Sequence, residues 1–217
     1  LNLLVVLTQD YDVSLMNPPY GSGGRMPNSV QDYVDSHYEY TSEYYINFFE
    51  ACDRLARTNG RVGMLVPRSF MFLKSFQDFR EDFIGGRGSF DFLTEFGVGI
   101  LDNATVRPAG TVVRSGIENK QESTFIRIND VKNNDKESSF LHASFVNSVE
   151  DGVTRQYRRD LTDFKMVPGT PLTYWIPTEM RQLYESEAVL DAENGGVERD
   201  SYGTVKVGLQ TGDDGRF

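Results

Sequence analysis

Two consecutive prolines, Pro18 and Pro19, constrain the fold of this chain more than any other feature. They follow Tyr11 to Met16, a short apolar run whose composition favours a β-strand. Proline fixes φ and has no N–H group to donate to a sheet, so the strand must end at Asn17. The glycines and polar residues from Gly21 to about Tyr40 then predict a long flexible loop.

Two later segments have apolar residues at helical spacing. They extend from Ser42 to Thr58 and from Ser69 to Ile84. We expect Asn59-Gly60 to end the first helix and Gly85-Gly86 to end the second. A third helix is predicted from Pro177 to Leu190.

Four short apolar runs predict further strands, at residues 62–66, 90–96, 110–113 and 124–128. Strands that alternate with helices in this order predict an α/β domain with a mainly parallel sheet. Because the last two strands are joined by a short polar link, we expect them to form an antiparallel hairpin at the sheet edge. The pattern weakens after a polar turn at residues 133–137, which predicts a domain boundary near residue 135.

The composition argues against several kinds of site. Cys52 is the single cysteine, which excludes a disulfide within the chain and a cysteine-rich zinc cluster. His37 and His142 are far apart in the sequence, so we expect no metal site. No apolar run approaches the roughly 18 residues that span a membrane. No secretory signal is visible, so we expect a cytoplasmic protein without membrane contact.

The net charge of −10 is unusual for a nucleic-acid-binding protein, because contact with phosphates favours a basic surface. The chain has 6 lysines and 16 arginines beside 32 acidic residues, a balance expected in a high-salt cytoplasm, where screening shortens electrostatic attraction. Alternatively, the basic surface that faces DNA lies in other parts of the protein. The charge is therefore evidence against tight DNA binding by these residues alone.

The tetrapeptide Asn17-Pro18-Pro19-Tyr20 carries the chemistry that we predict for this chain. An aromatic amine such as N6 of adenine is a poor nucleophile, because its lone pair is delocalised into the ring. The side-chain carbonyl of Asn17 and the backbone carbonyl of Pro18 can accept its hydrogens and free the lone pair, and proline rigidity holds these acceptors in place. Tyr20 offers a ring for stacking on a base that is flipped out of a duplex. The simpler alternative is a turn that only ends a strand.

Four stretches of the sequence resemble one enzyme family. Residues 11–21 resemble motif IV of the N6-adenine DNA methyltransferases. Residues 44–70, with a Gly-Arg-Val strand that leads into Pro-Arg-Ser-Phe, are similar to the part that follows in that family, and residues 103–113 resemble its later motif. Residues 206–217 resemble the Gly-Leu-x-Thr-Gly-Asp block of large enzymes of the PglX type, which belong to bacteriophage-exclusion systems.

The resemblance implies a site-specific adenine-N6 DNA methyltransferase that uses S-adenosylmethionine as the methyl donor. The expected fold is the C-terminal half of a Rossmann-like core, a mixed sheet with a terminal β-hairpin. Residues 1–135 would form the catalytic portion, and residues 136–217 a linker and the beginning of a target-recognition region. The expected catalytic residues are Asn17, Pro18, Pro19 and Tyr20. The expected partners are DNA and other proteins of a phage-defence or restriction–modification system.

The resemblance is incomplete in two places. The family's glycine-containing donor-binding turn and its acidic ribose-binding residue are absent, and we expect them upstream, so this chain alone should be inactive. In the later motif many relatives carry an aromatic residue that stacks on the flipped base, whereas the corresponding stretch here is Gly99 to Asp102. Phe96 is the nearest aromatic candidate for that role.

The densest basic cluster, Arg155, Arg158 and Arg159, is a candidate for contact with a phosphate backbone. Its acidic neighbours favour an ordinary solvated face instead. Thr211 lies in a Thr-Gly-Asp turn that we expect near DNA on the family resemblance alone. Trp175 could stack on a base, although core packing is the interpretation that we favour.

Two further functions fit the same tetrapeptide. Asn-Pro-Pro-Tyr also serves methyltransferases that act on RNA bases or on a protein glutamine, although those enzymes are usually compact and lack an extension like residues 135–217. The other hypothesis is a non-catalytic DNA-binding module that retains the motif as a relic.

Overall fold

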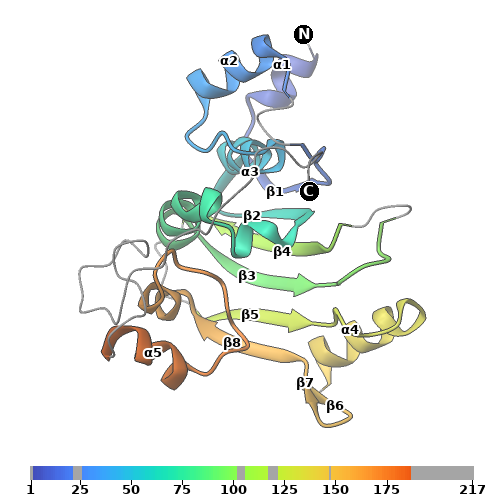
Figure 1. Ribbon diagram of the computed structural model, residues 1–217. Helices are drawn as coiled ribbons and strands as arrows, with labels where there is room; N and C mark the ends of the chain where they lie inside the picture. Colours follow the sequence, from blue (N-terminus) through green and yellow to red (C-terminus); the bar gives the residue numbers. More distant parts are fainter. Residues whose placement is uncertain (1, 22–25, 102–105, 117–121, 147, 187–217) are drawn as a thin grey trace, which may run out of the picture.

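The computed structural model of the chain describes residues 2–21, 26–101, 106–116, 122–146 and 148–186. A six-stranded sheet forms its centre, with the strands in the order β1-β2-β4-β3-β5-β8 (Figure 1). The strands are β1 (Tyr11–Met16), β2 (Ala56–Pro67), β3 (Gly88–Glu95), β4 (Pro108–Ser115), β5 (Glu122–Arg127) and β8 (Gln156–Asp160). The β1–β2 and β3–β5 pairs are parallel, whereas the β2–β4, β3–β4 and β5–β8 pairs are antiparallel. The predicted α/β class is confirmed, with a mixed sheet.

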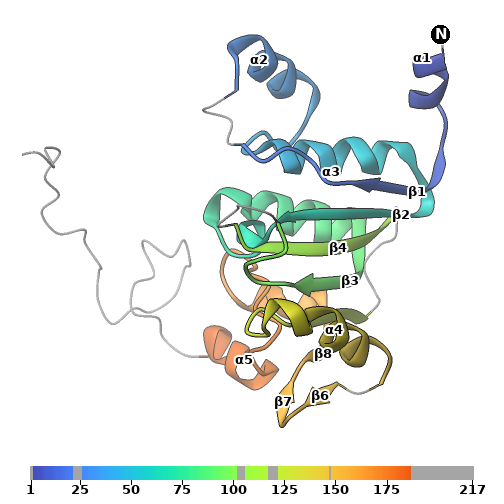
Figure 2. The same cartoon turned by 90° about the vertical axis from the view of Figure 1, so that its right-hand side faces the viewer.

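Helices and short helical turns connect these strands. They are α1 (Asn2–Leu7), α2 (Asn28–His37), α3 (Tyr44–Leu55), η2 (Arg68–Met71), η3 (Lys74–Phe76), η4 (Phe79–Arg87), η5 (Asn133–Asp135), α4 (Lys136–Phe145), η6 (Leu161–Met166) and α5 (Thr178–Ser186). A separate hairpin pairs β6 (Val149–Glu150) with β7 (Val153–Thr154). α1 and α2 lie at the β1 end of the sheet, and α4 and α5 lie at the β8 end (Figures 1 and 2).

The hairpin predicted for the last two strands is wrong. β4 lies between β2 and β3 and is antiparallel to both, while β5 pairs in parallel with the other side of β3. A central position buries Ala109 and Val113 of β4 almost completely, which a hairpin at the sheet edge would not do. The short polar link between β4 and β5 predicted that the two strands are neighbours, but β3 lies between them.

The loop predicted from Gly21 to Tyr40 is also wrong in part, because it contains α2. Pro27 precedes this helix with a φ of −57°, which suits the start of a helix. Val34 is its buried residue, so the helix lacks the apolar stripe by which sequence patterns are recognised. The Tyr33 and His37 rings stack one turn apart with their centroids 4.1 Å apart, which stabilises the exposed side.

The end of α3 differs from the prediction as well. α3 ends at Leu55 and β2 begins at once with Ala56, so Asn59-Gly60 lies inside a strand. Asn59 has a φ of 65°, and the β1–β2 register shifts opposite this point. A side chain at Gly60 would place its Cβ 2.7 Å from the Arg57 carbonyl oxygen, so this irregularity in the strand requires glycine.

The second predicted helix is divided into η2, η3 and η4, and Gly85-Gly86 lies within η4 rather than after it. Arg80 explains the division. Its side chain is 2% exposed, and the guanidinium donates to the carbonyl oxygens of Phe70 and Leu73, each at 2.8 Å. In a continuous helix those carbonyls would accept from backbone N–H groups, so Arg80 stabilises the interruption.

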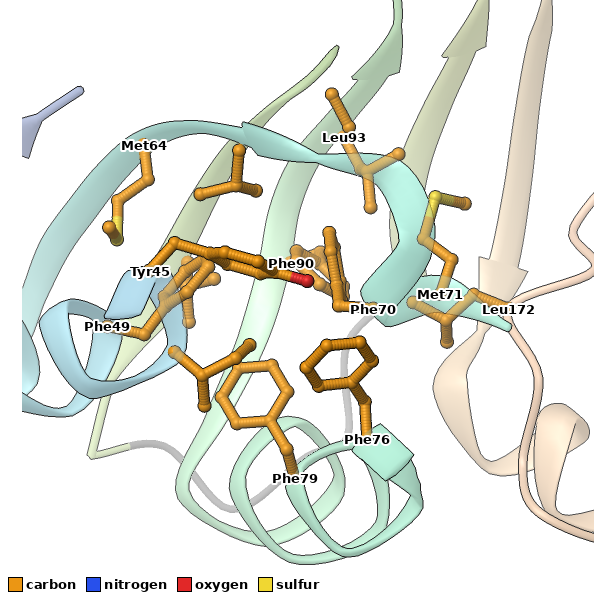
Figure 3. Packing of buried hydrophobic residues seen from close by; sticks show 14 of the residues in the cluster. Tyr45, Phe49, Met64, Phe70, Met71, Phe76, Phe79, Phe90, Leu93 and Leu172 are labelled. Carbon is orange, nitrogen blue, oxygen red and sulfur yellow. The ribbon is translucent and has the colours of Figure 1, made fainter. Parts of the chain in front are cut away.

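One face of the sheet carries the main core, which is rich in aromatic rings (Figure 3). Phe49 of α3, Phe79 of η4, Phe70 of η2 and Phe90 of β3 are each at most 1% exposed. Successive rings among them are 5.5 to 6.5 Å apart in tilted or perpendicular arrangements. Such contacts stabilise a core beyond the area that they bury.

The packing does not divide at residue 135. Leu161, Phe164, Leu172 and Tyr174 belong to the same buried cluster as the residues of α3 and η4. β8 extends the same sheet through its pairing with β5. Where target recognition begins therefore stays a prediction, and residues 187–217, with the rest of the helix predicted to Leu190, lie outside the described residues.

Candidate active site

The tetrapeptide Asn17 to Tyr20 lies at the carboxyl end of β1, against the last part of β2. The parallel register places Met16 opposite Met64, so the motif, which follows Met16, lies beside the residues of β2 that follow Met64, beginning with Leu65. The Tyr20 hydroxyl donates to the Leu65 carbonyl oxygen at 3.2 Å. Pro18 is buried, which fixes the backbone on which the neighbouring side chains are mounted.

The Tyr20 ring packs against the Tyr45 ring of α3. The two rings are perpendicular, with centroids 6.4 Å apart, and the Tyr45 hydroxyl is 3.2 Å from the Ser69 hydroxyl. Partial burial raises the pKa of Tyr20 above its ordinary value, so this phenol stays neutral and keeps its proton for the bond to Leu65. Tyr20 is thus held in place as an uncharged ring.

The Asn17 side chain is exposed, in contrast to Pro18. Within the described part of the chain, no hydrogen bond involves its amide. An amide that is fixed at its backbone and unbonded at its tip is available to a ligand. Such availability is one condition of the predicted acceptor role, which stays a prediction.

A shallow pocket of about 520 Å³ adjoins Asn17 on the sheet face opposite the main core. Its lining includes Leu15, Asn17, Gly63, Phe96, Gly110 and Phe140. The Phe96 ring lies directly over Gly110, where an added Cβ would be 2.8 Å from a ring carbon. The structure thus brings Phe96 and Asn17 to one pocket, which keeps Phe96 a candidate for the second stacking ring.

Sequence reasoning missed a buried network beside this edge. The Glu95 side chain is fully buried, accepts from Arg68 Nη1 at 2.5 Å and accepts from the Tyr174 hydroxyl at 2.5 Å. Burial, followed by the charge of Glu95, raises the pKa of Tyr174, which therefore remains a donor. A charged residue at the end of an apolar strand was the available signal for it.

A second pocket, of about 460 Å³, lies where β2 ends and β4 begins. Arg68, Ser69, Phe72 and Arg107 are among its lining residues. Neither this pocket nor the one beside Asn17 has an acidic lining residue, so neither offers a carboxylate for the ribose hydroxyls of S-adenosylmethionine. The acidic residue that the family resemblance implies for the ribose therefore stays a prediction outside these two pockets.

The basic residues predicted to contact DNA lie far from Asn17 in the sheet. Arg155 is 9% exposed and forms ion pairs with Asp130 and Glu150, which gives it a structural role. Arg158 and Arg159 are on β8, at the opposite edge of the sheet from β1. Arg158 is exposed, while Arg159 packs over the Tyr157 ring at 5.8 Å. Thr211 lies outside the described residues.

The described ranges contain no group of three or more His, Cys, Asp or Glu side chains arranged to hold a metal ion. None of their helices is long and apolar enough to cross a membrane.

Comparison with solved structures identifies the class of fold. The methyltransferase subunit of a type I restriction-modification system from Streptococcus thermophilus matches with a TM-score of 0.53 at 13% identity, over 77% of this chain and 38% of that chain. The type IIG restriction endonuclease BpuSI matches with a TM-score of 0.54 at 14% identity, over 83% of this chain and 23% of that chain. Such low identities show the fold alone, and they confirm the predicted methyltransferase type of α/β fold.

Sequence comparison then finds particular relatives. Residues 5–97 match the family described as Eco57I restriction-modification methylase. The chain is 27% identical over 203 residues to the adenine-specific methyltransferase PglX of Lacticaseibacillus casei (strain Zhang), over 87% of this chain and 16% of the relative. It is 23% identical over 176 residues to the adenine-specific methyltransferase BrxX of Escherichia coli O9:H4 (strain HS), over 78% of this chain and 14% of the relative. The chain therefore spans about one sixth of the length of these curated relatives.

Proposed function

We propose that this chain carries the catalytic portion of a site-specific adenine-N6 DNA methyltransferase in a phage-defence or restriction–modification system. One observation carries the proposal: the Asn17 amide is exposed, has no hydrogen bond to the described residues and lines a pocket together with Phe96, on a backbone held by buried Pro18. The similarity to two adenine-specific methyltransferases supports adenine as the target. DNA and further proteins of such a system are the partners that we propose.

Asn17 and Pro18 act on the target nitrogen as a pair of hydrogen-bond acceptors. The Asn17 side-chain oxygen and the Pro18 carbonyl oxygen accept the two N6 hydrogens, which favours a tetrahedral nitrogen with a free lone pair. Because Pro18 and Pro19 fix the backbone, these acceptors need little reorganisation during the reaction. S-adenosylmethionine, when bound, supplies the electrophilic methyl group.

Two aromatic side chains hold the base in this account. Tyr20, fixed by Leu65 and Tyr45, offers one ring face, and Phe96 is the candidate for the other. Stacking on an aromatic side chain contributes about 1–3 kcal/mol per base, enough to offset much of the cost of flipping. The neutral Tyr20 hydroxyl serves to orient the ring. As the N6–methyl bond forms, the methyl–sulfur bond of the donor would break, and the cationic nitrogen would then lose one proton to water.

The test compares N6-methyladenine in the genomic DNA of cells that carry the intact gene with cells that carry Asn17→Ala. Mass spectrometry of nucleosides is expected to detect the modified base with the intact gene and to lose it in the variant. An unchanged level of N6-methyladenine in the variant, or none in either strain, would contradict the proposal. Measurement of methylated adenine in RNA and of methylglutamine in protein from the same cells separates the RNA and protein alternatives.

A further inference from the structure

Two arginines share one pocket at the carboxyl edge of the sheet. Arg68 directly follows β2, Arg107 directly precedes β4, and the Arg68 amide donates to the Arg107 carbonyl oxygen at 3.1 Å. Both residues line the pocket of about 460 Å³, together with Ser69 and Phe72. Glu95 compensates the charge of Arg68, so the two guanidinium groups together leave one positive charge at this pocket. A positive charge on a pocket whose lining has no acidic residue favours an anionic ligand.

The guanidinium of Arg68 is held in one orientation. Its Nη1 donates to the fully buried Glu95 carboxylate, and its Cζ lies 5.5 Å from the centre of the Phe72 ring. Glu95 is itself fixed by the Tyr174 hydroxyl. Arginine has five N–H donors, and in the described residues the other N–H groups of Arg68 have no hydrogen bond. Because Glu95 and Phe72 already fix this guanidinium, it loses little conformational entropy when it binds an oxyanion.

Among the described residues, Arg107 has no carboxylate partner, whereas several other arginines there form ion pairs. It is exposed, and none of the ion pairs found between described residues includes it. By contrast, Arg57 pairs with Asp12, and Arg87 pairs with Glu39. In a chain with a net charge of −10, an arginine without an ion pair to the described residues, beside a second arginine, is a local excess of positive charge.

The positive charge continues along this edge toward β5. The Phe72 ring lies 5.7 Å from the Trp175 ring, and the Arg127 guanidinium lies 4.7 Å above Trp175. Trp175 is therefore engaged in packing, as the sequence favoured. Arg68 packs on Phe72 and Arg127 packs on Trp175, so the two arginines are separated by the aromatic pair and are not clustered.

We propose that Arg107 and Arg68 bind a backbone phosphate of the DNA strand that presents adenine to Asn17. Leu65 borders the pocket beside Asn17, and Pro67 borders the arginine pocket. These two residues of β2 are about 7 Å apart at the usual rise of a strand. The phosphate site is thus adjacent to the place of the target base, and this inference rests on the proposed DNA substrate.

The test measures how DNA binding by the full-length protein depends on salt. A fluorescent duplex of random sequence is titrated between about 50 and 200 mM salt, with Arg107→Ala and Arg107→Lys beside the wild type. Loss of one phosphate contact lowers the slope of log K against log salt by about one. We expect this change and a roughly ten-fold loss of affinity for Arg107→Ala, the size of one charge-assisted hydrogen bond, and a smaller loss for Arg107→Lys.

The matched control is Arg57→Ala, because Arg57 is an exposed arginine at the start of β2, the strand that pairs with β4, and its side chain is 64% exposed. It is expected to leave the slope unchanged. Equal changes in Arg57→Ala and Arg107→Ala, or no change in Arg107→Ala, overturn the phosphate site. A loss of binding to duplex RNA with unchanged binding to DNA also overturns it. Asn17→Ala is expected to keep the wild-type slope in the same assay, because Asn17 carries no charge. The phosphate site can therefore be judged from the salt slope even if the methylation test fails.

Discussion

The two faces of the central sheet are built differently. On the face that packs against α3 and η4, aromatic side chains such as Phe90 are at most 1% exposed. On the opposite face, α4 covers the part over β3 and β5 through Phe140, while Leu15 of β1 remains 76% exposed. The first face holds the fold together. The second face, next to β1, leaves room for a ligand beside Asn17.

The difference teaches that stability and chemistry are separated within one sheet. Prolines and a partly buried tyrosine fix the segment Asn17 to Tyr20 locally, so its position does not depend on deep burial of β1. The open face keeps the Asn17 amide accessible, and each of the following substitutions tests this separation.

The largest effect is expected from truncation on the packed face. Phe90→Ala removes a ring between Phe70 and Phe125 and leaves a cavity, which costs about 3–5 kcal/mol of stability. Leu15→Ala, on the open face, is expected to change stability by less than about 0.5 kcal/mol. Hydrogen exchange of peptides from β2 and β4 measures both. Similar losses of protection in the two variants would contradict the division into faces.

A smaller loss is expected where charge is buried. Glu95→Ala leaves Arg68 and Tyr174 without their acceptor, at a cost of about 2–3 kcal/mol, because Arg68 can still reach solvent. The comparison variant is Glu39→Ala, which removes a pair with Arg87 in which both side chains are about half exposed. That pair contributes about 0–1 kcal/mol. Thermal unfolding distinguishes them, and equal melting temperatures would show that the Glu95 network is not a structural element.

Two glycines on the open face sharpen the assignment of the pocket. A Cβ at Gly110 would lie 2.8 Å from the Phe96 ring, whereas a Cβ at Gly63 would meet the free end of the Leu15 side chain at 2.4 Å. In Gly63→Ala the exposed Leu15 side chain can rotate into solvent, whereas in Gly110→Ala the Phe96 ring must move away from the pocket position it now occupies. We therefore expect Gly110→Ala to slow methylation about ten-fold, or about 1.4 kcal/mol, and Gly63→Ala to have little effect. Equal rates would remove Phe96 from the site.

The smallest expected effect concerns Asp53 at the end of α3. Burial raises the pKa of this carboxyl, partly opposed by a hydrogen bond from Ser115 at 2.6 Å. An acid with a raised folded-state pKa stabilises the fold below its unfolded pKa, and this contribution is lost as pH rises through the folded pKa. Asp53→Asn keeps an acceptor for Ser115, so it should be slightly more stable at pH 7 and lose that advantage near pH 4. Melting curves at both pH values check the sign, and a variant less stable at pH 7 would contradict it.

Local patterns predicted much of this fold. The strand that ends at Asn17, the helix around Tyr45 and Phe49, and the strand at residues 62–66 all follow from apolar spacing and proline chemistry, and the structure confirms them. The order of strands did not follow, because the pairing of β4 with both β2 and β3 depends on contacts between distant segments. α2 was missed because Val34 is its buried residue.

The candidate site was predictable to a similar degree. Asn17 to Tyr20 were singled out by their residue types, and their catalytic role stays a prediction. The Arg68–Glu95 pair joins residues 27 positions apart, and sequence spacing gave no reason to connect them. Arg155 appeared accessible from its basic neighbours, yet tertiary packing pairs it with Asp130 and Glu150.

The central claim is that the exposed Asn17 amide acts in the chemical step. Its most direct test is single-turnover transfer of a labelled methyl group from S-adenosylmethionine to unmethylated host DNA by the full-length protein, for the wild type and Asn17→Ala. The account predicts a fall of about 10²–10³-fold in the rate constant, the usual size for loss of one preorganised hydrogen bond, with DNA affinity unchanged. A variant that transfers methyl at the wild-type rate would contradict it.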